Sequence, residues 1–132
     1  MRLPRPATIR PPRRHTWDPR RVIVPPPPPA PPATVLEVQL LDAMTLIWFF
    51  SAPVTITGGG GADPPCPQLQ ANDRIHGWVG ALGVEAYDAA AVLAYYPVGT
   101  TLDLDSLYRV IAPPDNLAFA GGLALPQSGQ MV

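Results

Sequence analysis

Proline is the residue that most constrains this chain, because 12 of its 20 prolines fall within the first 32 residues. Five of them form the unbroken run Pro25–Pro29. Proline has no backbone N–H and a fixed φ, so such a segment cannot form a helix interior or a central strand. We therefore predict an extended arm over residues 1–33 and one folded domain over residues 34–132, which is long enough to enclose its own core.

The charges divide at the same boundary. Seven of the nine arginines lie between Arg2 and Arg21 and only Asp18 opposes them, so the arm carries a charge of +6. The rest of the chain has two arginines and nine carboxylates, which gives −7 and an overall charge of −1. The planar guanidinium suits carboxylate or phosphate partners. A coding bias toward arginine explains the absence of lysine equally well.

Three kinds of segment follow one another within the arm. Trp17 stands in the sequence HTWDP, and residues 20–24 (RRVIV) combine two arginines with strand-forming residues. Residues 25–32 are predicted to form a stiff polyproline II rod that rises about 3.1 Å per residue. Fully extended, the arm could reach on the order of 100 Å, and much of it is expected to have no fold of its own.

We interpret the arm as a tether that lies on neighbouring subunits of an assembly, because this accounts for its arginines, its apolar anchors and its stiff spacer together. Its predicted contact residues are Arg10, Arg13, Arg14, Trp17, Arg20, Arg21, Val22, Ile23 and Val24. The last three could add a strand to the sheet edge of a neighbour. The alternatives are arginines that bind nucleic-acid phosphates, a proline ligand for a small recognition domain, and a disordered linker.

From Thr34 onward the sequence alternates with a period of two, which is typical of β-strands. Strands are expected at residues 35–42, 45–51, 54–57, 68–71, 74–79, 83–87, 91–96, 102–105, 106–112, 117–119 and 123–125. Residues rich in turn formers separate them, and the alanines at 89–91 could instead open a short helix. Short strands at this spacing predict an all-β domain, either a β-sandwich or a small barrel.

Three bulky rings, Trp48, Phe49 and Phe50, follow one another in the second expected strand. Successive side chains of a strand point to opposite faces. The core therefore holds either Phe49 or the pair Trp48 and Phe50. A ring on the other face is covered by a loop of the same domain or forms a docking patch.

The sequence offers little for catalysis, and we predict that the protein is not an enzyme and binds no cofactor. His76, expected on a strand, is the histidine of the folded domain, and His15 lies in the arm. None of the three serines, Ser51, Ser106 and Ser128, lies in a Gly-x-Ser-x-Gly elbow. Each histidine lacks the further ligands that a metal site needs.

Other residue patterns have simpler structural interpretations. Asp103 and Asp105 could hold calcium, but we favour a strand on which Leu102 and Leu104 face inward and both aspartates face water. The glycine-rich loop at residues 58–67 has no Gly-Lys-Ser/Thr, so it is not a phosphate loop. Cys66 in that loop has no disulfide partner and is interpreted as a bystander thiol.

The N-terminus does not resemble a signal peptide, because prolines and arginines occupy the place of the apolar region. The most apolar stretch, residues 36–54, is interrupted by charged and polar residues and alternates, so it is not expected to span a membrane. We expect a protein made and used in the cytosol, or one exported by another route.

Residues 45–55 (TLIWFFSAPVT) resemble a motif of bacterial and phage immunoglobulin-like domains, in which a strand of the form T-L-x-V-x-F precedes S-A/E-P-V. Residues 99–112 and 117–132 are similar to a later strand and the closing hairpin of such domains. The resemblance implies a structural or adhesive β-sandwich with no catalytic residues. The chain departs from the pattern at residues 58–67 and 75–88, and the arm has no counterpart in the motif.

Together these features predict an immunoglobulin-like β-sandwich preceded by a proline-rich arm, acting as a bacteriophage virion structural protein assembled in the host cytoplasm. It would be a decoration, cementing or minor capsid-associated protein. The predicted partner is the major capsid protein, another virion subunit or a second copy of the chain, and no membrane or small-molecule substrate is expected. The alternatives are a nucleic-acid-associated protein that uses the basic arm and a cell-surface adhesion module.

Overall fold

The structure is a computed structural model that describes residues 25–60 and 62–132. All regular secondary structure in this part of the chain is β-strand. The strands are β1 (Val35–Asp42), β2 (Thr45–Phe50), β3 (Thr55–Ile56), β4 (Cys66–Asp73), β5 (Gly77–Ala81), β6 (Gly83–Asp88), β7 (Ala91–Tyr95), β8 (Leu107–Val110), β9 (Leu117–Ala118) and β10 (Gln127–Gln130). None of the described residues belongs to a helix able to cross a membrane.

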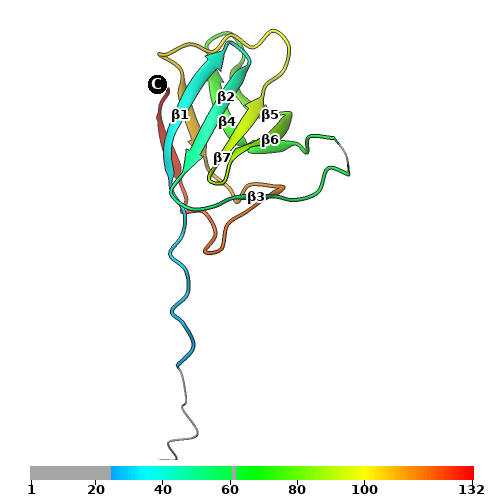
Figure 1. Cartoon of the computed structure of the whole chain (residues 1–132). Coiled ribbons are helices and arrows are strands. Elements are labelled where there is room, and N and C mark those ends of the chain that lie inside the picture. The colour runs from blue at the N-terminus through cyan, green and yellow to red at the C-terminus, as the bar shows by residue number, and fades with distance from the viewer. Residues whose placement is uncertain (1–24, 61) are drawn as a thin grey trace, which may run out of the picture.

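Two four-stranded antiparallel sheets, β1-β2-β7-β6 and β10-β8-β4-β5, enclose the core in a β-sandwich-like arrangement (Figure 1). A small pair of strands, β3 and β9, lies near one end. Leu82 alone separates β5 from β6, so the chain passes from one sheet into the other at this residue. The prediction of an all-β fold is confirmed.

The three aromatic rings of β2 alternate between the two faces of the sheet, as the sequence requires. Trp48 and Phe50 lie in the core with 0% and 2% of their surface exposed, whereas Phe49 is half-buried on the outer face. The ring of Phe49 meets Tyr87 of β6 edge to face at 6.0 Å. The third ring is therefore flanked by a side chain from another strand of its own sheet.

A chain of hydrogen bonds connects the two sheets through the core. The indole Nε1 of Trp48 donates to the hydroxyl of Tyr96 at 3.2 Å, and that hydroxyl donates to the carbonyl of Leu69 at 2.9 Å. Burial raises the pKa of Tyr96, so the phenol stays neutral. The Trp48 ring also meets Tyr108 edge to face at 5.3 Å. These contacts fix the two sheets against each other.

The expected strand at residues 74–79 is wrong in its first half. The carboxylate of Asp73 accepts a hydrogen bond from the backbone N–H of Ile75 at 2.9 Å, which closes a turn. Gly77, with φ of 79°, completes that turn. His76 therefore lies in the turn between β4 and β5, and not on a strand.

The expected strand at residues 102–105 is also wrong, because Asp103 forms a turn there. Its carboxylate accepts hydrogen bonds from the N–H of Asp105 and the hydroxyl of Ser106. Leu102 is buried, as expected, but Leu104 is 57% exposed. An apolar residue in a turn thus gave the same alternating pattern as a strand.

Two further expectations need correction. Residues 123–125 form no strand, since Leu123 makes only a single parallel bridge, to Ala33. Cys66 is not in a loop but begins β4, where it is fully buried. Burial raises the pKa of its thiol to about 12.

Candidate functional site

The predicted contact residues of the arm all lie outside the described residues. They are Arg10, Arg13, Arg14, Trp17, Arg20, Arg21, Val22, Ile23 and Val24. The structure does describe the rod that follows them. Residues 25–32 are exposed and lead away from one end of the domain, where β1 begins (Figure 1).

The rod joins the domain through a buried junction at Ala33, which is 1% exposed. The N–H of Ala33 donates to the carbonyl of Gly122, and its carbonyl accepts from the N–H of Ala124, both at 2.8 Å. Next to this bridge, a Cβ atom on Gly121 would lie 2.4 Å from the carbonyl oxygens of Ala30 and Pro31. Only glycine permits this approach, so the base of the rod is held by packing and by hydrogen bonds on both sides of Ala33.

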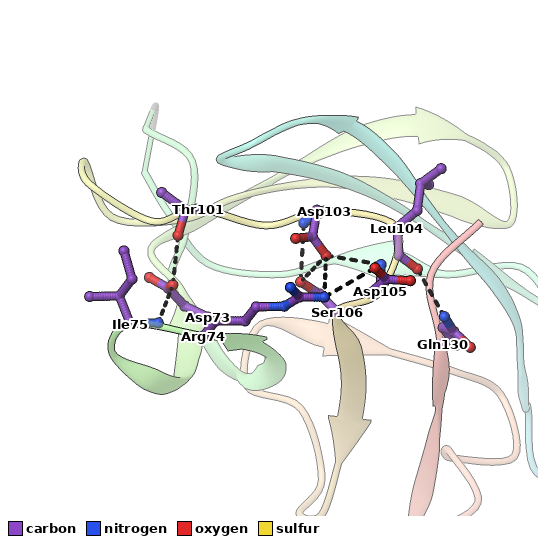
Figure 2. A network of polar contacts seen from close by, with 9 residues as sticks. All are labelled: Asp73, Arg74, Ile75, Thr101, Asp103, Leu104, Asp105, Ser106 and Gln130. Atoms are coloured by element: carbon purple, nitrogen blue, oxygen red, sulfur yellow. Dashed lines mark hydrogen bonds and ion pairs between the residues drawn. The ribbon is translucent and has the colours of Figure 1, made fainter.

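At the other end of the domain, Asp73 organises a network of polar contacts (Figure 2). Its side chain is fully buried and accepts from His76 Nδ1 and, at 2.9 Å each, from the N–H of Ile75 and the hydroxyl of Thr101. The hydrogen bond from His76, followed by that from Ile75, holds the pKa of Asp73 well below its usual range. The carboxylate thus connects the β4–β5 turn with the loop that precedes β8.

Arg74 extends this network across the surface (Figure 2). Its guanidinium lies 3.5 Å from a carboxylate oxygen of Asp103 and 3.1 Å from one of Asp105. These side chains are 49% to 76% exposed, so water screens the pairs and each contributes little to stability. Asp103 and Asp105 therefore help to fix the conformation of the loop before β8. A hydrogen bond from Gln130 Nε2 to the carbonyl of Leu104 holds the same loop.

Asp73 and His76 form a hydrogen-bonded carboxylate–imidazole pair, as two members of a catalytic triad do, but no hydroxyl or thiol of the described residues is hydrogen-bonded to the imidazole. The hydroxyl that reaches the pair belongs to Thr101, and it donates to the carboxylate itself. The Ser106 hydroxyl is bonded to Asp103, and Ser51 accepts the N–H of Thr34 at the arm junction. Among residues 25–60 and 62–132, no three His, Cys, Asp or Glu side chains are placed to hold a metal ion.

Sequence reasoning missed a pairing on the outer face of the β10-β8-β4-β5 sheet. The guanidinium of Arg109 stacks on the ring of Trp78, 4.1 Å from its centre, and Arg109 Nε donates to Gln70 at 2.7 Å. The register places Arg109 opposite Gln70, but no local pattern predicts which strands pair. The stack holds in a fixed position one of the two arginines of the acidic domain.

Among the strands that the structure describes, the edge strand β6 has the longest exposed stretch that carries acidic residues. Its last four residues, Glu85 to Asp88, are all exposed. The hydroxyl of Tyr95 donates to Glu85, and this hydrogen bond is the main cause that raises the pKa of Tyr95 to about 12. Asp63 lies against the start of the strand, 3.1 Å from where a Cβ on Gly83 would be.

A comparison with protein-family models, with curated proteins and with solved structures finds no match to this chain. Its function is therefore inferred from the residues and the geometry above. The best-defined features are the buried arm junction, the polar network opposite to it, and the acidic edge of β6.

Proposed function

We propose that this protein is a non-enzymatic structural protein of a bacteriophage virion that docks on the shell through its N-terminal arm. The junction at Ala33 is the observation that carries this proposal. It joins the rod to the segment between β9 and β10 by two backbone hydrogen bonds of 2.8 Å. The base of the arm is therefore held to the folded domain on both sides of Ala33, which suits an attachment element.

The order of the strands supports an immunoglobulin-like domain. In such domains strands A, B, E and D form one sheet and strands C, F and G the other. Here β1-β2-β7-β6 follows the order A-B-E-D, and β10-β8-β4 follows G-F-C with β5 as an additional edge strand. Such a fold suits a binding module. At the end of the domain away from the arm, the side chains of Asp73 and Asp103 form hydrogen bonds with residues of the neighbouring loops and turns.

The proposed mechanism is binding alone. The arginines at positions 10, 13, 14, 20 and 21 would pair with acidic groups of the shell, and Trp17 with residues 22–24 would supply apolar anchors. An arm that becomes ordered on docking loses conformational entropy, which offsets part of the contact energy. The acidic domain opposes nucleic-acid binding by the same arm, so a protein partner is favoured.

Trypsin protection tests this proposal. Trypsin does not cut before proline, so Arg5 and Arg10 resist it, and the other five arm arginines remain as sites. We expect rapid cleavage after Arg21 in the free protein and strong protection in the native particle. The exposed bond after Arg74, at the far end of the domain, is the internal reference. Equal cleavage rates of the arm in both samples would refute the proposal.

A further inference from the structure

The acidic edge of β6 is open to strand addition around Ala86. Beyond it, β3 contacts the strand, and the N–H of Val54 donates to the carbonyl of Ala89 just after its end. At its start the N–H of Val84 donates to the carbonyl of Pro64 at 3.0 Å, so the loop before β4 covers this part of the edge. Backbone groups two residues apart in a strand face the same side. Ala86 therefore faces the same open side, and no described residue forms a hydrogen bond with its backbone there.

The side chains along this edge combine negative charge with an aromatic surface. Glu85 and Asp88 are exposed on β6, and Tyr87, 53% exposed, meets the ring of Phe49. Asp63 adds a third carboxylate beside Gly83. A segment that fits must bring positive charge, apolar side chains and a strand conformation at once.

Residues 20–24 of this same chain have that chemistry. Two arginines precede Val22, Ile23 and Val24, which are strand-forming and apolar. We propose that residues 20–24 of one copy add to the edge of β6 in a second copy. Arg20 and Arg21 pair there with Glu85 and Asp88, and the apolar tract covers Tyr87.

The rod explains why the acceptor is a second copy. Eight residues of polyproline II, the length of the rod at residues 25–32, span roughly 25 Å. β6 lies three strands from β1 in the same sheet, or about 14 Å at the usual strand spacing. The rod also leads away from the domain (Figure 1). The tract could reach its own β6 only if the rod folded back on itself, which polyproline II resists.

Docking of this kind is head to tail, because the arm of one copy meets the edge of the next. Such a contact produces a closed ring or an open filament, depending on the rotation between copies. The inference rests on the proposed function, since it adds a second copy of the chain to the subunits on which the arm docks. Opposite net charges of the arm and the domain favour the contact, and added salt weakens it.

Sedimentation velocity of the full-length chain tests the inference with variants that reverse the charges of the arm, of the β6 edge, or of both. We expect the wild-type chain to associate as its concentration rises at low salt. Glu85→Arg with Asp88→Arg should weaken association by about tenfold or more, and so should Arg20→Glu with Arg21→Glu. The chain that carries all four substitutions should associate again, because each new arginine then faces a new glutamate.

The matched control is Asp42→Arg with Asp105→Arg, which changes the net charge equally at exposed sites away from β6. Like Asp88, which accepts the N–H of Ala89, Asp42 accepts a backbone N–H in the following turn, that of Met44. The control should associate like the wild type.

Two results would overturn the inference: a wild-type chain that stays monomeric, or a β6 variant that associates as well as the control. A monomeric chain whose arm is still protected in the particle would refute this inference alone. Loss of that protection as well would refute the proposed function too.

Discussion

The hydroxyl of Tyr96 accepts a hydrogen bond from the indole nitrogen of Trp48, 3.2 Å away across the core. The same hydroxyl donates to the Leu69 carbonyl on the facing sheet. Both Trp48 and Tyr96 are buried, so water cannot replace either bond. This relationship makes Tyr96 the polar connection between the two sheets, and the rest of the core is packed around it.

Replacing Tyr96 by phenylalanine should destabilise the domain by about 1–3 kcal/mol, because it leaves a buried N–H and a buried carbonyl without partners. The midpoint of urea unfolding would measure this change. The matched control is Tyr95→Phe at the neighbouring position, whose hydroxyl bonds the exposed Glu85. That control should change stability by less than about 0.5 kcal/mol. Equal effects of the two variants would contradict the role assigned to Tyr96.

Asp73 should make the domain sensitive to acid. Its folded-state pKa is lowered, chiefly by the hydrogen bond from His76, below the unfolded value of about 3.9. The stability from this group is therefore fully present above the unfolded pKa and is lost as pH falls through the folded pKa. We expect Asp73→Asn to lower the urea midpoint at pH 7 and to flatten its decline between about pH 5 and pH 2.

The control for this pH dependence is Asp115→Asn, since Asp115 makes its hydrogen bonds with Gln68 at an exposed site. This variant should keep the acid-dependent decline of the wild type. An Asp73→Asn variant with an unchanged decline would show that other carboxylates control acid unfolding.

Gly121 should be necessary for the seating of the arm. Alanine there would bring a Cβ atom to 2.4 Å from the carbonyl oxygens of Ala30 and Pro31, so the base of the rod must move. We expect Gly121→Ala to cost about 1–3 kcal/mol and to speed hydrogen exchange of the Ala33 and Ala124 amides. Ala120→Ser, at the exposed neighbouring position, should leave that exchange unchanged.

Cys66 should report on whether the domain is folded. Its side chain is fully buried and burial raises the pKa of the thiol to about 12, so little thiolate is available to an aromatic disulfide reagent. We expect slow labelling of the native protein at pH 8 and fast labelling in denaturant. Rapid labelling without denaturant would mean that the start of β4 opens readily.

The sequence predicted the strands whose alternation matches their burial, and β8 and the second half of β4 are the clearest examples. It failed where an aspartate formed a turn inside an alternating stretch, as Asp73 does before Ile75 and Asp103 before Asp105. Periodicity records only which residues alternate. A carboxylate that accepts a nearby N–H ends a strand without changing that pattern.

The candidate site also has some features that the sequence predicts and others that depend on the fold. The charge of the arm and its stiff rod are visible in the sequence, because they depend on composition alone. The junction is not, since Ala33 and Gly122 are far apart in the chain and only the fold brings them together. The acidic edge of β6 likewise depends on which strand ends the sheet, and the Arg109–Trp78 stack on which strands pair.

We propose that the arm is the part that attaches the protein to its assembly. Under the proposed function, the most direct test is co-sedimentation with particles of the proposed phage that lack this protein, using two complementary chains. One holds residues 25–132, with Cys66 labelling as the check of its fold, and the other joins residues 1–32 to an unrelated monomeric domain. We expect the arm fusion to sediment with the particles and residues 25–132 to remain in the supernatant. Sedimentation of residues 25–132 without the arm, while the fusion stays in solution, would contradict it.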